Sequence, residues 1–405
     1  MKTKRRLVQF GFLALTIVGV YVLKGNAERW CPFGGVEAAY MYFSQGQMLC
    51  SLGVSNFYIL GAVLILTLLL RRVFCGYMCP IGAISEWLGA GAKRLGIKPW
   101  KIPPKADRVL SLGKYAVLAI VLYFTLKVGE LMFRTADPCY ALISRHGEDI
   151  TYWAYIVSGA IVAGSLFIVI PFCRWFCPLA AVLNVFSKFG LARIRRNESS
   201  CIDCGKCARV CPMAIPVSTV KQVTAARCMS CMDCLDSCPE LKGGALVWGP
   251  AGSTRSWSQG VLIAVVFGVV VSAVAAAYFA PLPSYVWERG ERPAEVASVD
   301  LQIHNLTCRG RATMLTQFFI DRDDMFELPG YVKVEAWPGP GIARARVFFD
   351  PSQTSAEAIK QAITEPYFNA AQDGDVLGEG IWASSPFIIE GYGVDDIVPD
   401  PTPAP

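Results

Sequence analysis

Two cysteine runs with the same spacing constrain this chain more than any other feature. Each run reads C-x2-C-x2-C-x3-C-P; the first contains Cys201, Cys204, Cys207 and Cys211, and the second Cys228, Cys231, Cys234 and Cys238. Thiolates at these intervals hold [4Fe-4S] clusters, and in two-cluster ferredoxins the fourth cysteine of each run ligates the other cluster. The sequence therefore predicts one cluster on Cys201, Cys204, Cys207 and Cys238 and another on Cys228, Cys231, Cys234 and Cys211. A structural zinc site, with four ligands and a longer spacer between pairs, fits this pattern poorly.

The composition of the chain indicates a membrane protein. Apolar residues make up 54% of the 405 residues and charged residues only 17%, a balance too apolar for an ordinary soluble protein. Five apolar stretches have the length of a membrane span or nearly so. They are Leu7 to Leu23, Phe57 to Leu70, Val109 to Val128, Tyr152 to Ile170, and Val261 to Phe279.

The distribution of charge predicts how these spans are oriented. Lysine and arginine gather before the first span, between the second and third, and after the fourth, where Lys188, Arg193, Arg195 and Arg196 precede the cluster cysteines. Short basic loops remain in the cytoplasm. We therefore expect a multi-pass protein of the bacterial cytoplasmic membrane, with membrane lipid around its spans. The cluster cysteines would be cytoplasmic, and everything from Pro281 onward extracytoplasmic. These basic loops explain the net charge of +6, and no basic–aromatic patch suggests nucleic acid.

The membrane part contains an internal repeat. Residues 72–83 read RVFCGYMCPIGA and residues 171–181 read PFCRWFCPLAA, with the cysteines at one constant interval (173 − 75 and 177 − 79 both equal 98). Each motif follows an even-numbered span, which predicts two parallel two-helix repeats. Cysteines four apart share a helix face, and the following proline suits the first position of a new helix. We expect Cys75, Cys79, Cys173 and Cys177 to converge in an additional cluster or metal site; free buried cysteines and a zinc knuckle are the alternatives.

The remaining cysteines and histidines of the membrane part allow further predictions. Cys31, Cys50 and Cys139 lie in the loops predicted to face outward, where a disulfide is the first expectation; alternatively, the loops dip into the membrane and Cys31 and Cys139 act as ligands.

The chain has two histidines, His146 and His304, and neither lies in a span. Membrane haem commonly needs axial histidines, so we predict no haem. His146 is a candidate proton acceptor for a quinol.

From Glu295 onward the hydrophobic pattern changes to that of an α+β domain. Strands are predicted near residues 299–303, 332–336 and 343–349, helices over 312–320 and 355–363, and a last strand near 380–389. This order corresponds to the ferredoxin-like split βαβ plan. The segment resembles the heavy-metal-associated domain of copper chaperones through Asn305 to Gly310 and Val347 to Pro351. That family has a second thiolate where this chain has Arg311, so Cys308, with His304, forms at most a weak metal site, and the resemblance implies the fold more than metal transfer.

Five segments follow from these patterns. The predicted fold class is a membrane α-helical bundle of two parallel two-helix repeats plus a fifth span, an inserted two-cluster bacterial ferredoxin domain, and a C-terminal α+β ferredoxin-like (split βαβ) domain. The boundaries are residues 1–196 for the four-span part with both C-x3-C-P motifs, 197–250 for the ferredoxin domain, 257–280 for the fifth helix, 295–390 for the outer domain, and 391–405 for an acidic, proline-rich tail expected to be disordered.

Residues 1–246 resemble the NapH-type membrane ferredoxins, and also NosR-type and CcoG-type proteins, through the two C-x3-C-P motifs and the paired cysteine runs. The resemblance implies membrane-bound electron transfer, commonly coupled to quinol oxidation, with a partner oxidoreductase or electron carrier and the quinone pool as partners. The leading hypothesis is an electron relay between quinone and such a partner. The alternative is an accessory protein that supplies electrons for copper or other metal-centre assembly.

Overall fold

A computed structural model shows two compact units, Met1–Ala280 and Pro281–Pro405. The structure describes residues 2–22, 31–45, 55–100, 102–128, 133, 137–143, 151–253, 255–280, 283, 285–289, 293, 295–307, 309–320, 330–339, 341–364, 367–369, 381–383 and 385–392. The first unit contains both repeat motifs and both cysteine runs. Each unit has a hydrophobic core of its own.

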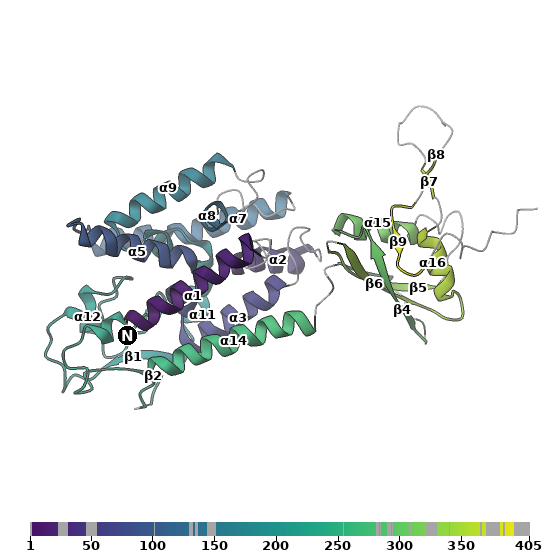
Figure 1. The fold of residues 1–405 in the computed structure, drawn as a ribbon. Helices are drawn as coiled ribbons and strands as arrows, with labels where there is room; N and C mark the ends of the chain where they lie inside the picture. The colour runs from purple at the N-terminus through teal and green to yellow at the C-terminus, as the bar shows by residue number, and fades with distance from the viewer. Residues whose placement is uncertain are drawn as a thin grey trace, which may run out of the picture. The chain divides into compact units, whose positions relative to one another are not determined.

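The first unit is a bundle of helices with an irregular, cysteine-rich segment at one end (Figure 1). Its helices before the cysteine runs are α1 (Lys2–Tyr21), α2 (Pro32–Gln45), α3 (Ser55–Leu70), α4 (Val73–Tyr77), α5 (Pro80–Arg94), α6 (Pro104–Leu110), α7 (Gly113–Val128), α8 (Pro138–Ile143), α9 (Tyr152–Phe167), α10 (Pro171–Trp175) and α11 (Pro178–Ser187). After the runs, α14 (Gln259–Phe279) returns along the bundle and packs on α3.

Proline marks the start of many of these helices. Pro32, Pro80, Pro138 and Pro178 are the first residues of α2, α5, α8 and α11. Proline is favoured there because its fixed φ suits the helix and its missing N–H would have no intrahelical partner. Three of these prolines directly follow a cysteine, and the fourth precedes one, so the positions of the helix starts also fix the positions of the cysteines.

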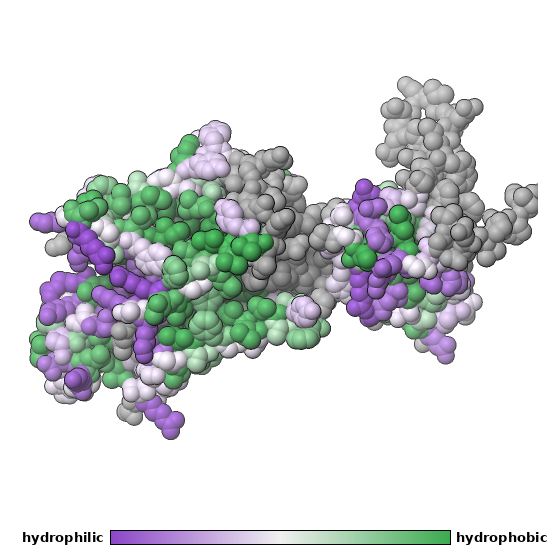
Figure 2. Space-filling model, viewed as in Figure 1, coloured by the Kyte–Doolittle hydropathy of each residue, from purple (hydrophilic) through white to green (hydrophobic). Residues whose placement is uncertain are grey.

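Apolar side chains cover the outside of the bundle. Leu15, Ile120, Tyr155 and Val271 are each more than half exposed, and Figure 2 shows hydrophobic residues over the helical face while hydrophilic residues gather at the end with the N-terminus. Within the described residues, two helical stretches are long and apolar enough to cross a membrane, Pro104–Val128 and α14. The other three predicted spans contain helices too, α1, α3 and α9, but these fall outside that criterion, so their crossing remains a prediction.

The cysteine-rich segment is closed at its base by a two-stranded antiparallel sheet. β1 (Ala192–Arg196) pairs with β2 (Leu246–Pro250), with Ile194 opposite Trp248. Between these strands lie three short helical turns, α12 (Lys206–Arg209), η3 (Val217–Thr219) and α13 (Asp233–Asp236). The buried Trp248 packs edge-on against Trp257, with ring centroids 5.4 Å apart. The sheet thus brings together the two ends of the segment that carries both cysteine runs.

The second unit is a five-stranded sheet with two helices. Its main strands and helices are β3 (Tyr285–Glu288), β4 (Ala297–His304), α15 (Arg309–Ile320), β5 (Tyr331–Trp337), β6 (Ile342–Phe349), α16 (Ala356–Thr364) and β9 (Ile388–Ile389), and a separate short pair is β7 (Tyr367–Asn369) with β8 (Ile381–Ala383). The sheet order is β3-β5-β6-β4-β9, with β9 antiparallel to β4. Without β3, this is the strand arrangement of a split βαβ domain; β3 adds an edge strand that the sequence pattern did not predict.

Replacing Gly330 with alanine should destabilise the second unit. Gly330 has a φ of +89°, and a Cβ there would lie 2.6 Å from Cβ of Gln353, so both the backbone and the packing oppose a side chain. We expect the free energy of unfolding to fall by more than about 1 kcal/mol. The measurement is the rate of proteolysis of the second unit in the full chain, which should increase. Gly339→Ala is the matched control, because its Cβ would meet no atom within 4 Å; equal proteolysis rates for the two variants would contradict the argument.

Candidate iron–sulfur sites

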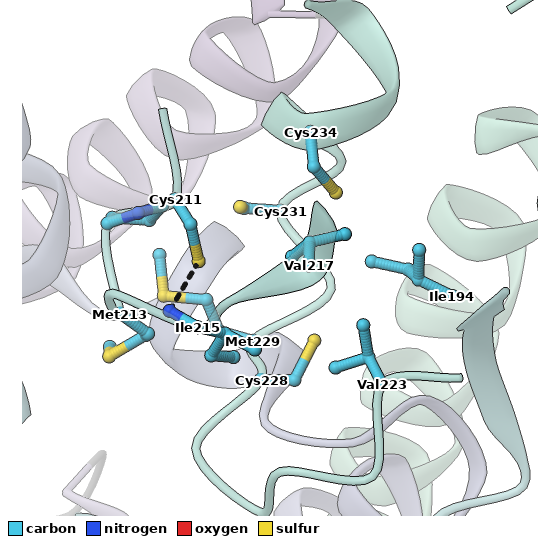
Figure 3. Close-up of a pocket in the computed structure, with 11 residues that line it drawn as sticks. Ile194, Cys211, Met213, Ile215, Val217, Val223, Cys228, Met229, Cys231 and Cys234 are labelled. Atoms are coloured by element: carbon cyan, nitrogen blue, oxygen red, sulfur yellow. Dashed lines mark hydrogen bonds between the residues drawn. The ribbon is translucent and has the colours of Figure 1, made fainter. Parts of the chain in front are cut away.

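The first candidate site is a pocket that brings together cysteines from both runs. Cys211 of the first run lines it with Cys228, Cys231 and Cys234 of the second (Figure 3). The remaining wall is apolar and consists of Ile194, Pro212, Met213, Ile215, Val217, Val223 and Met229. The backbone N–H of Ile215 donates to Sγ of Cys211 over 3.4 Å. This is the grouping that the crossover rule predicts for one of the two clusters.

The second candidate site has the complementary set of cysteines. Cys201, Cys204, Cys207 and Cys238 line one pocket, together with polar residues that include Arg196 and Asp203. Only Cys207 of these four thiols is buried, and the neighbouring Ile202 is 61% exposed. The second pocket is therefore closer to solvent than the first.

The two cysteine loops share an unusual backbone conformation. Asp203 and Gly205 in the first run have φ values of 51° and 65°, and the equivalent Ser230 and Met232 in the second run have values of 49° and 63°. Left-handed conformations are costly for residues other than glycine. Alternating them with right-handed residues turns successive N–H groups toward one side, which suits an anionic centre. Both loops are therefore wound in the same way around their pockets.

The thiols of the first pocket are suited to metal coordination and poorly suited to carrying charge alone. Burial raises the pKa of Cys211 to about 11, and burial also raises the pKa of Cys231 and of Cys234 well above the usual value for a thiol. Buried thiols of this kind become thiolates together only when a positive metal centre offsets their charge. The donor set, four soft sulfur atoms in an apolar wall, fits an iron–sulfur cluster.

Two consecutive arginines join the first pocket to the helical bundle. Arg71 and Arg72 follow α3 and are both fully buried. Arg71 donates through Nη1 to the carbonyl oxygen of Val223 at 2.8 Å and through Nη2 to those of Thr224 at 2.9 Å and Ser187 at 3.3 Å. The backbone N–H of Arg72 donates to the carbonyl oxygen of Cys228 at 3.3 Å. A ligand-bearing loop of the pocket is thereby bonded to the segment that leads into the first C-x3-C-P motif.

Two groups of ion pairs, centred on the buried Arg5 and Asp107, fasten the same loop from other sides. Arg5 of α1 pairs with Asp233 at 3.3 Å and donates to the carbonyl oxygen of Cys231, and it also pairs with Glu86 of α5. Asp107 of α6 accepts from Arg227 at 2.7 Å and from Arg174 at 2.6 Å. The cysteine-rich segment is thus held on α1, α6 and α10 as well as on the α3–α4 turn.

Replacing Arg71 with methionine should loosen the cysteine-rich segment. Methionine keeps much of the side-chain length but removes the donor to the carbonyl oxygens of Val223 and Thr224, whereas that of Ser187 still accepts from the N–H of Gly190. Each unsatisfied buried acceptor costs about 1–3 kcal/mol. We expect a lower unfolding temperature and faster loss of iron to a chelator. Arg193→Met is the matched control, since Arg193 donates to the Gly190 and Lys188 carbonyl oxygens at 3.4 Å from a half-exposed position. An Arg71 variant as stable as that control would contradict this role.

The two C-x3-C-P motifs have the same local conformation. Cys79 and Cys177 each precede a helix with φ of −67° and ψ of 119° and 116°. The N–H of Cys79 donates to Phe74 at 3.0 Å, and the N–H of Cys177 to Phe172 at 2.9 Å. Cys75 and Cys173 lie inside the short helices α4 and α10 and are buried. The structure thus brings all four predicted cysteines to the centre of the bundle, with two at helix starts and two within helices.

Cysteines from the predicted outward loops reach the same region. A cavity of about 280 Å³ is lined by Cys31, Cys79, Cys139, Cys173 and Cys177, and by Asp137. Cys31 and Cys139 are free thiols. The geometry therefore favours the interpretation in which these loops dip inward, and it argues against a disulfide between the two cysteines. Asp137 is 9% exposed, although the charge pattern places it in an outward-facing loop. The sequence feature that could have predicted this burial is its position directly before Pro138-Cys139.

Three predicted site residues lie outside the described part of the chain: His146, Cys50 and Cys308. His304 ends β4, and Arg311 is exposed in the first turn of α15. Among the described residues, no three His, Cys, Asp or Glu side chains converge closely enough for a single metal ion. The same holds for both ferredoxin pockets, whose thiols surround a space larger than a single metal ion would leave.

Comparisons with known proteins agree with this geometry. A family model for a 4Fe-4S binding domain matches residues 52–98 and 150–197, which contain the two C-x3-C-P motifs, and a model for a 4Fe-4S dicluster domain matches residues 193–243. The chain is 31% identical over 229 residues to the uncharacterized protein MJ0750 of Methanocaldococcus jannaschii, covering 56% of this chain and 90% of the relative. It is 29% identical over 284 residues to the putative electron transport protein YccM of Escherichia coli, covering 65% and 78%. It is also 26% identical over 220 residues to the ferredoxin-type protein NapH of Haemophilus influenzae, covering 52% and 74%.

The chain belongs to the NapH- and NosR-like 4Fe-4S ferredoxin-type proteins. The resemblance to this family is therefore confirmed, and the chain is an iron–sulfur electron-transfer protein. Both matched family models lie within the first unit. No solved structure shows significant similarity to the chain.

Proposed function

We propose that this ferredoxin-type protein carries electrons between the quinone pool of the bacterial cytoplasmic membrane and a partner oxidoreductase. The observation that carries the proposal is the cavity of about 280 Å³ inside the bundle, which connects apolar, membrane-facing helices with the cysteines of both C-x3-C-P motifs. The cysteine-rich segment is bonded to the same motifs through Arg71 and Arg72. One route therefore links the apolar cavity with the two ferredoxin pockets.

Two [4Fe-4S] clusters would be held by the two pockets. Cys211, Cys228, Cys231 and Cys234 would bind one, and Cys201, Cys204, Cys207 and Cys238 the other. When bound, each cluster accepts and releases one electron at a time. The first pocket is buried against the bundle, whereas the second is nearer to solvent, which suits the second to exchange with a soluble partner in the cytoplasm. The exposed Ile202 beside Cys201 would give that partner an apolar contact.

The apolar end of the cavity is suited to the quinone. Leu15, Val18 and Gly19 of α1 line it together with Val270, Ala273 and Val274 of α14. Val18 and Val274 are also exposed on the outside of the bundle, so the wall here is shared with the lipid-facing surface. A hydrophobic molecule dissolved in the bilayer would reach the cysteines without passing through water.

Asp137 supplies the polar group that quinol oxidation requires. Each quinol gives up protons together with its electrons, so a proton acceptor must lie close to the ring. Asp137 lines the cavity, and its Oδ1 accepts from the backbone N–H of Cys139 at 2.9 Å. We assign the proton-accepting role to Asp137, because His146, the candidate from the sequence, lies outside the described residues.

Pairs of cysteine variants test the assignment of ligands. If Cys211 and Cys228 hold one cluster, the Cys211→Ser/Cys228→Ser protein should lose about four irons per chain, as each single variant does. Cys211→Ser/Cys201→Ser affects both pockets and should lose about eight. Iron analysis and paramagnetic resonance of anaerobically purified full-length protein provide the measurement. A pairing in which Cys211 groups with Cys201 would reverse the two results.

A bulky residue at the apolar end of the cavity tests the quinone site. Ala273→Trp should overpack the space, at a cost of about 1–3 kcal/mol. Quinol would bind more weakly by this amount, so quinol-dependent reduction of the clusters should slow about tenfold or more. Reduction by dithionite should be unchanged, since it needs no cavity. Ala264→Trp is the control, because Ala264 is exposed on the same helix and does not line the cavity. If both variants accept electrons from quinol at the normal rate, the quinone belongs elsewhere or is not the substrate.

The second hypothesis, a role in metal-centre assembly, depends on metal binding by the second unit. The metal-chaperone loop needs two thiolates, and this chain has the exposed Arg311 at the second position. We therefore do not propose metal transfer for this unit. Its extracytoplasmic location remains a prediction of the charge pattern.

A further inference from the structure

Of the six cysteines that the structure describes in the helical bundle, four share a setting that Cys75 and Cys173 do not. Cys31, Cys79, Cys139 and Cys177 all line the cavity and are half-buried. The thiol of Cys139 lies within electrostatic range of those of Cys31, Cys79 and Cys177. The four come from four different segments, two in each half of the bundle: Cys31, Cys79 and Cys177 directly precede helices, and Cys139 lies in the first turn of α8.

Three of the four thiols stand at the start of a helix with at least ten residues. Cys31 precedes α2, Cys79 precedes α5, and Cys177 precedes α11. The first backbone amides of these helices lie near the thiols: those of Phe33 and Gly34, of Ile81 and Gly82, and of Ala180. The positive end of a helix stabilises a thiolate and lowers the cost of holding several thiolates together.

Cys75 and Cys173 play a different part. They are 7% and 3% exposed, and Cys75 does not line the cavity. Nη2 of Arg72 lies 3.6 Å from Sγ of Cys75 and 3.4 Å from the carbonyl oxygen of Cys173. Cys173 also lines the cavity, but it lies inside α10 and is buried, and together with Cys75 it contacts and positions the Arg72 guanidinium.

Arg72 is an independent indication of negative charge at this place. It is fully buried, and no carboxylate pairs with it among the residues that the structure describes. Its side-chain partners there are Asn184 at 3.2 Å, Cys75 and Cys173. A buried cation without a counter-ion is costly, and the thiolates of a metal centre would supply the missing charge. Cys177, one of the four cavity thiols, lies within electrostatic range of Arg72.

A single metal ion does not fit the spacing of these thiols. A zinc ion draws four sulfur atoms to about 2.3 Å from one point, whereas no three metal-binding side chains converge in this way within the described ranges. A polynuclear cluster holds its four cysteines farther apart, as the two ferredoxin pockets of this chain also do. The cavity provides the space between the thiols.

We infer that Cys31, Cys79, Cys139 and Cys177 bind a third iron–sulfur cluster inside the helical bundle. This site goes beyond the proposed electron relay, because it adds Cys31 and Cys139 as ligands and removes Cys75 and Cys173 from the predicted set. It also assigns Arg72 as a positioning residue that compensates the charge of the site.

Iron and acid-labile sulfide analysis of the anaerobically purified full-length protein tests this inference. The wild type should contain about twelve irons per chain for a [4Fe-4S] cluster at the third site, or about ten for a [2Fe-2S] cluster. Cys31→Ser and Cys139→Ser should each reduce the content to about eight while the paramagnetic resonance signals of the two ferredoxin clusters persist. Those signals also show that the variants have folded. Cys75→Ser, the matched variant within the motif, and Cys308→Ser, in the second unit, should retain the wild-type iron content.

Alkylation of the wild-type protein provides a measurement that needs no variant. Cys31 and Cys139 should resist N-ethylmaleimide in the iron-loaded protein and react after the iron is removed by oxidation and chelation. About eight irons in the wild type, or a Cys31–Cys139 disulfide in peptide mapping, would overturn the inference. Loss of iron in Cys75→Ser but not in Cys31→Ser would return the site to the four motif cysteines. None of these results depends on quinol, so the quinone proposal stands or falls separately.

Discussion

The bonding of two buried arginines at the end of α3 is the interaction on which the first unit depends. Arg71 reaches the carbonyl groups ahead of the second cysteine run, and Arg72 reaches both that run and the first C-x3-C-P motif. Neither guanidinium can be removed without leaving buried acceptors unsatisfied. The helical bundle and the ferredoxin segment therefore form one core, which contains Cys75 and Cys173 together with Cys228 and Cys234.

Much of this organisation follows from local patterns in the sequence. The spacing of Cys201 to Cys238 predicts which cysteines share a pocket, because cluster ligation fixes the order of ligands along the chain. Proline after Cys79 and Cys177 predicts two helix starts, since proline fits the first helical turn. In the second unit, alternation of apolar residues predicts strands, and the structure has strands at 297–304, 331–337 and 342–349. These features depend on interactions between residues close in the chain.

The features that the sequence does not reveal depend on contacts between distant residues. Cys31 and Cys139 lie in segments whose charge indicates the outward side, yet in the structure both line the cavity that Cys79 also lines. The repeat predicts the four motif cysteines as one set, and in the structure Cys79, Cys173 and Cys177 line the cavity while Cys75 contacts Arg72. The other partners of Arg72, Asn184 and Cys173, are more than 100 residues away in the chain. Contacts over such distances leave no local pattern.

The ion pair of Arg5 connects the first helix of the chain with a loop synthesised much later. Arg5 and Cys231 are 226 positions apart, so this contact of α1 can form only after the second cysteine run has been synthesised. The placement of the first helix of the chain therefore depends on the folding of a segment that follows it by more than 200 residues.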